Sequence, residues 1–253
     1  MTTLSLTMEY DGTGFRGWAR QPGQRTVEAS LRDALDEIYA GCWENLAVAG
    51  RTDTGVHATG QVASVQVSGG APADRAAEAL NTALPPDVCV LAAQEAPESF
   101  HARFSALSRS YRYIILNRPE RSALEASRSL WWPRAVDLEV LHASAALLPG
   151  EHDFTAFTPA ETKHEVFVRV IHRAVWERRG DHLHFVVTAD SFLRHMVRVV
   201  VGTLLLVGRG LWTVDRLRPL LEGAPRGAAG PTAPAHPLTL VGVRYETPRD
   251  YKD

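Results

Sequence analysis

Asp53 is the residue whose sequence context most clearly indicates a catalytic role. It lies in residues 49–58, AGRTDTGVHA, in a turn bounded by Gly50 and Gly55 and beside Arg51 and His57. A nucleophilic carboxylate must be ionised and held still. A nearby guanidinium and backbone N–H groups achieve both, because they lower the pKa of the carboxyl group. An isolated Asp-x-Gly more often caps a turn through an Asx hydrogen bond, so both roles stay open at this point.

Arg198 is a second ionisable residue in an unusual setting, a segment that is otherwise apolar. From Met196 to Val207 the sequence is MVRVVVGTLLLV, which predicts a helix that is apolar nearly all round and therefore buried. A buried guanidinium keeps its charge and needs a partner, which is usually a carboxylate. Asp53 is the partner we expect. Arg198 could instead extend to the surface or pair with a structural acid, and we interpret the preceding His195 as structural.

Tyr111 belongs to residues 109–115, RSYRYII, whose alternation predicts a strand. Tyr111 and Tyr113 would lie on one face and Arg112 on the other. Core packing is the ordinary role of such a tyrosine, but a phenol also offers a π-face and a hydroxyl that can accept or relay a proton.

Residues 100–104, FHARF, alternate in the same way. The period of two separates the cations His101 and Arg103 from the apolar side chains, so Phe100 and Phe104 are expected to pack in the core. His101 and Arg103 are then candidate contacts to a polar partner.

The elements that must position these residues follow from periodicity and turn signals. Both halves of the chain show the order β-α-β-β-α-β, and Asp53 falls where two strands meet. The first half is predicted to contain strands at 4–10, 45–49, 60–67 and 88–93 and helices at 26–39 and 73–83. The second half is predicted to contain strands at 110–117, 166–177, 182–189 and 238–245 and helices at 138–148, 193–207 and 214–221.

This repeated order predicts an α+β fold. We expect two ferredoxin-like, RRM-like domains that form an extended, mostly antiparallel sheet with a central cleft. The predicted domains are residues 1–105, which carry Asp53, and residues 106–246, which carry Tyr111 and Arg198, followed by a tail at 247–253. Strand faces of this fold often bind RNA, but a fold alone does not establish a function.

Composition is that of an ordinary soluble enzyme. The net charge is −2, yet Lys163 and Lys252 are the only lysines, so almost all basic residues are arginine, which suits phosphate contacts and base stacking. A genome rich in G and C would produce the same bias. The sequence has no signal peptide and no run of eighteen apolar residues, which predicts a cytoplasmic protein without a membrane partner. Cys42 and Cys89 lack the spacing of a metal site or a disulfide framework, and we expect both to be small buried residues.

The ten residues around Asp53 closely resemble the GRTDxGVHA signature of the tRNA pseudouridine synthase A family. Four further strings resemble motifs of the same family: YDGTxFxGW near residues 10–18, FHARF, YRY, and FxxHMVRxxVG around Arg198. In that family the aspartate is the catalytic nucleophile, the arginine of the last motif pairs with it, and the tyrosine stacks on the target base.

By this resemblance, Asp53 is the nucleophile, Arg198 its partner and Tyr111 the stacking residue, while His101 and Arg103 contact RNA. The role of Arg51 stays open between orienting Asp53 and holding a phosphate. The chain departs from the family in two places. Pro237 stands where the approach to the last strand has glycine, and Ala19 stands where glutamine usually follows Gly-Trp.

The resemblance implies isomerisation of uridine to pseudouridine at positions 38, 39 and 40 of the tRNA anticodon arm. It also implies a homodimer, with tRNA crossing both subunits. No metal or other cofactor is required, because the glycosidic C–N bond is broken and remade as C–C without oxidation. Attack by Asp53 at C6 of the base, attack at C1′ of the sugar and a glycal route all remain open. Tyr111 is a candidate for removing the proton from C5.

Three other interpretations of the motifs are weaker. Residues 12–17 spell G-x-G-x-x-G, but a dinucleotide site needs a helix to begin directly there, and turn residues intervene; Asp11 beside it is interpreted as a turn residue. Asp53-Thr54-Gly55 mimics an aspartic protease triplet without a second copy, which only a homodimer could supply. A non-catalytic RNA-binding protein of paired ferredoxin-like domains remains the alternative, although the aromatic strings typical of such modules are absent.

Overall fold

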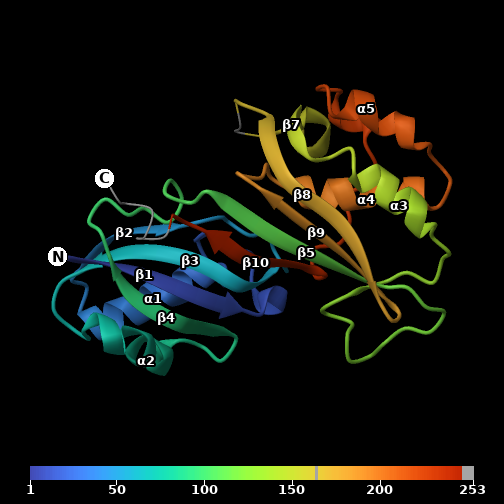
Figure 1. The fold of residues 1–253 in the computed structure, drawn as a ribbon. Helices are drawn as coiled ribbons and strands as arrows, with labels where there is room; N and C mark the ends of the chain where they lie inside the picture. The colour runs from blue at the N-terminus through green and yellow to red at the C-terminus, as the bar shows by residue number, and fades with distance from the viewer. Residues whose placement is uncertain (163–164, 247–253) are drawn as a thin grey trace. The chain divides into compact units, whose positions relative to one another are not determined.

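A computed structural model of the chain describes residues 1–162 and 165–246 and divides into two compact units. The first unit comprises Met1–Arg109 together with the segment that begins at Thr239, and the second comprises Ser110–Leu238. Figure 1 shows the first unit in blue and green with one red strand, and the second in yellow, orange and light green.

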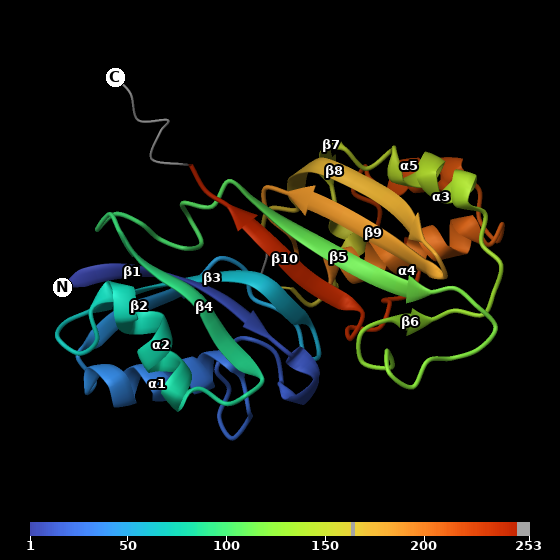
Figure 2. The same cartoon turned by 60° about the horizontal axis from the view of Figure 1, so that its bottom comes forward.

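The first unit has the predicted order β-α-β-β-α-β. Strand β1 runs antiparallel to both β3 and β4, and β2 runs antiparallel to β3, which gives the strand order β4-β1-β3-β2. Helices α1 and α2 lie together on one face of this sheet (Figure 2). The elements are β1 (Thr2–Tyr10), α1 (Val27–Tyr39), β2 (Trp43–Val48), β3 (His57–Val67), α2 (Ala73–Ala83) and β4 (Val88–Ala96).

Helix α1 begins where the sequence predicts it. The hydroxyl of Thr26 accepts a hydrogen bond from the backbone N–H of Ala29, which satisfies one of the free donors at the helix start. The helix ends at Tyr39, and the residue after it, Ala40, has a φ of 51°, in the left-handed region. Its apolar face, including Leu31 and Leu35, is fully buried against the sheet. Local capping and a continuous apolar stripe therefore define this helix.

The expectation that both cysteines are buried is wrong. Cys42 is exposed and Cys89 is half-buried. Cys42 follows the left-handed turn after α1, outside the core, and Cys89 lies between the buried Val88 and Val90 on β4. Alternation along a strand therefore turns Cys89 toward the opposite face from its neighbours.

The second unit is built on the strand order β5-β9-β8-β7. Strands β8 and β9 pair antiparallel, for example Trp176 with Phe185, and β7 pairs antiparallel with β8. Helices α3 and α4 cover the same side of these strands (Figure 1). The elements are β5 (Ser108–Leu116), β6 (Leu130–Trp131), α3 (Leu138–Ala145), β7 (Gly150–Asp153), β8 (Val168–Arg179), β9 (His182–Ala189), α4 (Met196–Gly208) and α5 (Leu217–Leu220).

The α+β class and the mostly antiparallel pairing are confirmed, with differences in detail. The short strands β6 and β7 were not predicted. The helix expected at 214–221 is a 3-10 turn, Val214–Arg216, followed by the single-turn α5.

The predicted boundary between the halves also differs from the structure. The sequence assigns residues 106–246 to one domain, whereas the last strand, β10 (Leu238–Arg244), pairs in parallel with the start of β3. Thr239 lies opposite His57, and Leu240 lies opposite Ala58. The segment from Thr239 onward therefore groups with the first unit, because strand pairing over so many residues leaves no local sequence signal. The predicted tail at 247–253 lies outside the described residues.

Candidate active site

Asp53 lies in the loop that joins β2 to β3, as the sequence predicts. The backbone N–H of Val56 donates to the carbonyl of Asp53 at 3.1 Å and closes a turn. Gly55 has a φ of 79°, a conformation that glycine adopts without strain. Asp53 is half-buried and Arg51 is exposed. The turn therefore holds the backbone of Asp53 while leaving part of the residue accessible.

Side chains of neighbouring strands fix the backbone that leads to Asp53. The amide of Gln61 donates to the carbonyl of Gly50 at 2.7 Å and to the hydroxyl of Tyr10 at 3.2 Å. Because the Tyr10 oxygen accepts that bond, its own proton can go to Thr52 Oγ1, which lies at 2.8 Å. The backbone N–H of Trp18 donates to the carbonyl of Thr52 at 3.0 Å. The carbonyls of Gly50 and Thr52 and the hydroxyl of Thr52 therefore each have a hydrogen-bond partner.

Tyr10 is buried in this network, with 3% of its surface exposed. Burial raises the pKa of Tyr10 to about 12, and its hydrogen bonds with Thr52 and Gln61 offset part of this effect. The phenol is therefore neutral at physiological pH and acts as a fixed hydrogen-bonding group. Its role was missed at the sequence level, because its partners lie 42 and 51 residues away.

Arg109 fixes the same loop at its first residue. This arginine is 7% exposed, and it donates to the carbonyl of Ala49 through Nε at 3.1 Å and Nη2 at 2.9 Å. Arg109 directly precedes the strand predicted at 110–117, and the sequence indicated no role for it. The presence of a charged residue just before the apolar alternation of β5 was the only signal that could have pointed to it.

The glycine-rich segment after β1 packs on the Asp53 loop. Gly12 donates its backbone N–H to His57 Nδ1 at 3.0 Å, and a Cβ at Gly12 would lie 2.0 Å from the carbonyl oxygen of Val56. Gly12–Gly14 forms a 3-10 turn, and α1 begins only at Val27, so the context of a dinucleotide fingerprint is absent. Asp11 caps this turn by accepting from the N–H of Thr13, which confirms its interpretation as a turn residue.

His101 and Arg103 lie in a turn and not in a strand, so the expected period of two is wrong. The backbone N–H of Ser105 donates to the carbonyl of His101 at 2.9 Å. Phe100 packs against Tyr245 as expected, at 5.0 Å between ring centroids, but Phe104 is 76% exposed. The turn reverses the chain after Ala102, and this directs Phe104 away from the core.

Tyr111 lies on β5 with its predicted orientation. Tyr111 and Tyr113 are buried while Arg112 between them is half-buried, which confirms the alternation. The ring of Tyr111 meets the ring of Phe192 edge to face, with centroids 5.0 Å apart. Tyr113 donates its hydroxyl to the carbonyl of Pro234 at 3.0 Å, and burial raises its pKa. The contact with Phe192 therefore holds the ring of Tyr111 in place.

Arg198 lies in the first turn of α4, a helix whose other residues are buried except Leu206. Arg198 is half-buried, and its Nε donates to the carbonyl of Ala233 at 2.9 Å. Ala233 in turn donates its N–H to the carbonyl of Arg198 at 3.1 Å. These two bonds fix the arginine against the segment before β10.

Pro237, one of the two departures from the family motifs, lies in a turn closed by the N–H of Leu238 and the carbonyl of Ala235. The carbonyl of Pro237 accepts the N–H of Ile114 at 3.2 Å. The substitution is therefore accommodated by a proline-compatible turn.

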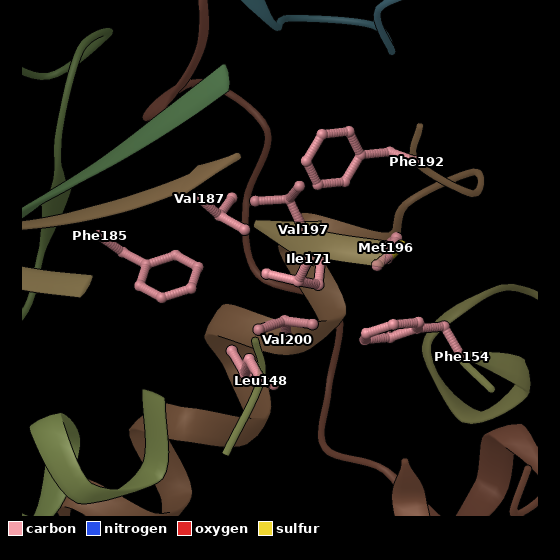
Figure 3. A pocket seen from close by; sticks show the side chains of 9 residues that line it. All are labelled: Leu148, Phe154, Ile171, Phe185, Val187, Phe192, Met196, Val197 and Val200. Atoms are coloured by element: carbon pink, nitrogen blue, oxygen red, sulfur yellow. The ribbon is translucent and has the colours of Figure 1, made fainter. Parts of the chain in front are cut away.

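An apolar cavity lies between α4 and the strands β8 and β9 (Figure 3). Its lining contains no polar side chain, so it offers no group for catalysis or for orienting a polar ligand. It includes Phe192, the residue that packs on Tyr111. Among the described residues no cluster of His, Cys, Asp and Glu could hold a metal ion. No helix in the same part of the chain is long and apolar enough to cross a membrane.

Asp53, Arg51, His101 and Arg103 therefore belong to the first unit. Tyr111 and Arg198 belong to the second unit. The pairing of Asp53 with Arg198 stays a prediction.

Comparison with known proteins gives consistent matches over the chain. A family model described as tRNA pseudouridine synthase matches residues 6–105 and 144–246, which include Asp53 and Arg198 but not Tyr111. The tRNA pseudouridine synthase A of Rhodospirillum rubrum is 44% identical over 246 residues, which cover 97% of this chain and 88% of that protein. The proteins of the same name from Paramagnetospirillum magneticum and Halalkalibacterium halodurans are 44% and 40% identical, over 97% and 94% of this chain and 96% and 90% of theirs.

A solved Cbf5-Nop10-Gar1 complex aligns with a TM-score of 0.33 and 12% identity, over 79% of this chain and 54% of that chain. The family model and the relatives agree along nearly the whole sequence. On that agreement, this chain belongs to the tRNA pseudouridine synthase family.

Proposed function

We propose that this chain converts uridine to pseudouridine at positions 38, 39 and 40 of the tRNA anticodon arm, with Asp53 as the nucleophile. Membership of the family makes the chain a tRNA pseudouridine synthase, which is an isomerase. The observation that carries the assignment of Asp53 is its loop, in which the carbonyls of Ala49, Gly50 and Thr52 all accept fixed hydrogen bonds. A loop held in this way positions the backbone of Asp53 before substrate arrives.

The reaction breaks the bond between C1′ and N1 of uridine and forms a bond between C1′ and C5. The proton on C5 leaves to solvent and N1 gains a proton, so nothing is oxidised or reduced. A base in a stem must first leave its stack at a cost of a few kcal/mol. Stacking on Tyr111 would offset part of this cost, and the edge-on contact with Phe192 supports the ring in that role.

Arg198 is proposed to hold Asp53 in its ionised form. Its Nε bond to Ala233 fixes the direction of the guanidinium, and an arginine fixed in this way makes strong, directional contacts to a carboxylate. Arg51 is exposed next to Asp53, which supports a contact to the RNA from this residue. His101 and Arg103 are proposed as further RNA contacts.

Three broader features belong to the same proposal. Both units are ferredoxin-like; the β4-β1-β3-β2 order of the first unit supports this. The enzyme acts as a homodimer that tRNA crosses, and light scattering of the purified protein tests this. It works in the cytoplasm, because tRNA is the substrate named for its relatives.

Release of tritium from tRNA labelled at C5 of uridine tests the proposal directly. Wild-type protein should release tritium from transcripts that keep a single uridine at position 38, 39 or 40. Asp53→Asn should release none, while the matched control Asp74→Asn, at an exposed residue of α2, should behave as wild type. Release by Asp53→Asn would refute the nucleophile, and tRNA binding without release by the wild type would favour a non-catalytic RNA-binding protein.

A further inference from the structure

Phe104 is a large apolar side chain that does not pack in the core. It is 76% exposed, although the other aromatic residue of its motif, Phe100, packs against a core cluster. An exposed phenylalanine contributes little to folding, so an isolated one needs no explanation. The surroundings of Phe104 are what make it unusual.

The turn that carries Phe104 is held by its own hydrogen bonds. The backbone N–H of His101 donates to Ser105 Oγ at 3.1 Å, and the carbonyl of His101 accepts the N–H of Ser105 at 2.9 Å. The Nδ1 atom of His101 accepts the N–H groups of Arg103 at 3.1 Å and Phe104 at 3.4 Å. The imidazole therefore caps the turn, and Nε2 carries the proton of the neutral ring.

The turn is also anchored in the core. Ala102 is completely buried, its N–H donates to Ser64 Oγ at 3.0 Å, and its carbonyl accepts the hydroxyl of Tyr245 at 2.6 Å. Phe104 therefore projects from a rigid segment. A ligand that contacts Phe104 would not have to order this segment first, so little binding energy is lost.

The imidazole of His101 and the guanidinium of Arg103 lie next to the exposed ring. The ring of His101 lies 4.4 Å from the ring of Phe104 at an interplanar angle of 33°. The guanidinium of Arg103 lies 5.5 Å from the centroid of the same ring. An aromatic face next to a guanidinium and an imidazole N–H donor is an arrangement with which proteins stack a nucleic-acid base while contacting the backbone.

One guanidinium connects this turn to the loop of Asp53. Arg109 donates to the carbonyls of Arg103 and Ala106 on one side and to the carbonyl of Ala49 on the other. Ala49 lies four residues before Asp53. The position of the exposed ring is thus linked to the candidate nucleophile within the same unit.

We propose that Phe104 is a stacking platform for a base of the bound RNA other than the target uridine. Arg103 and His101 hold the phosphates that flank this base. The proposal rests on the proposed function, since it takes tRNA as the ligand, and it adds a residue that selects and places the RNA around the reacting nucleotide.

Binding of full-length tRNA by purified variants tests the proposal. Phe104→Ala should raise the Kd for tRNA on the order of 10- to 100-fold, which is the usual effect of removing one stacked base. Phe104→Trp should restore wild-type affinity, because the stacking surface is retained. Leu124→Ala, a truncation at a side chain that is 95% exposed in the second unit, is the matched control and should bind as wild type. Thermal unfolding should be unchanged in all three variants.

Salt dependence separates stacking from charge. The slope of log Kd against log salt should be unchanged in Phe104→Ala and should fall by about one phosphate contact in Arg103→Gln. Binding of Phe104→Ala within twofold of wild type would overturn the proposal. Dissociation of a wild-type dimer by Phe104→Ala would also overturn it, by assigning the ring to a contact between copies. Tritium release by the wild type in the same preparations keeps failure of this inference distinct from failure of the proposed function.

Discussion

Arg109 donates two hydrogen bonds to the carbonyl oxygen of Ala49, from Nε at 3.1 Å and from Nη2 at 2.9 Å. The two residues are 60 positions apart, and the bonds join the strand that ends before the Asp53 loop to the start of β5. Arg109 and Ala49 are both buried. If the arginine were removed, water could not replace its hydrogen bonds to the carbonyl of Ala49. The rest of the loop is held in a similar way by Tyr10 and Gln61.

Replacing Arg109 with lysine should therefore lower both stability and turnover. A single ammonium group cannot reproduce the planar fork that reaches several carbonyls. We expect a loss of about 2 kcal/mol in the free energy of unfolding and a lower kcat. Urea denaturation and single-turnover tritium release measure these effects. Arg75→Lys, in an exposed pair with Glu78, is the control and should change neither. Wild-type kcat in Arg109→Lys would show that the bonds to Ala49 do not position the loop.

Tyr10→Phe removes only a hydroxyl, but it is the hydroxyl that joins Thr52 to Gln61. We expect a loss of about 1 kcal/mol of stability together with a reduced kcat. Tyr39→Phe is a matched control, because the buried Tyr39, the last residue of α1, donates its hydroxyl to the carbonyl of Ala71 and not to the Asp53 loop. It should lose similar stability and keep its kcat. Equal kcat values in the two variants would contradict a positioning role for Tyr10.

Gly12→Ala tests the contact between the glycine-rich segment and the turn after Asp53. The added Cβ would lie 2.0 Å from the carbonyl of Val56, so one of the two segments must move. Overpacking of this kind costs about 1–3 kcal/mol, and here it should also displace Asp53 and lower kcat. Gly242→Ala on β10, where no atom lies within 4 Å of the added carbon, should be neutral. Thermal unfolding and tritium release distinguish the two, and a fully active Gly12→Ala enzyme would argue against this contact.

Stability should fall in alkaline solution. Burial raises the pKa of Tyr10 to about 12, and it also raises the pKa values of Tyr113 and Tyr245. Since an unfolded tyrosine titrates near 10, the unfolded state loses its protons first, and the free energy of unfolding falls as pH rises above about 10. The contribution of Tyr10 is complete below pH 10 and is lost on the way to pH 12. Its largest slope is about 1.4 kcal/mol per pH unit. Urea titrations from pH 8.5 to 11.5 should show a shallower slope in Tyr10→Phe than in the wild type, and an identical slope would refute the assignment.

The sequence predicts most of the regular structure, because long apolar periodicities and caps are local. Thr26 predicts the start of α1, and the alternation of residues 109–115 predicts β5. The two-residue β6 and the four-residue β7 are too short to show a period. The failure at Phe104 has another cause: FHARF alternates like a strand, but hydrogen bonds to the imidazole of His101 fold it into a turn.

The candidate site is predictable to a similar degree. The motifs locate Asp53, and the structure confirms that it lies in a turn between two strands. They do not reveal the residues that hold this turn. Tyr10, Gln61 and Arg109 act through partners many positions away, and only the folded chain brings these groups together.

The pairing of β10 with the start of β3 has a consequence for how the enzyme is made. His57 and Ala58 directly follow the Asp53 loop, and their neighbours on β10, Thr239 and Leu240, are synthesised after the whole of the second unit. On a ribosome this delay is on the order of ten seconds, and during that time the first unit lacks β10. Nascent chains and truncated products that end before Thr239 would carry every residue of the Asp53 motif without this support. The topology thereby makes the support of the Asp53 loop depend on the synthesis of β10.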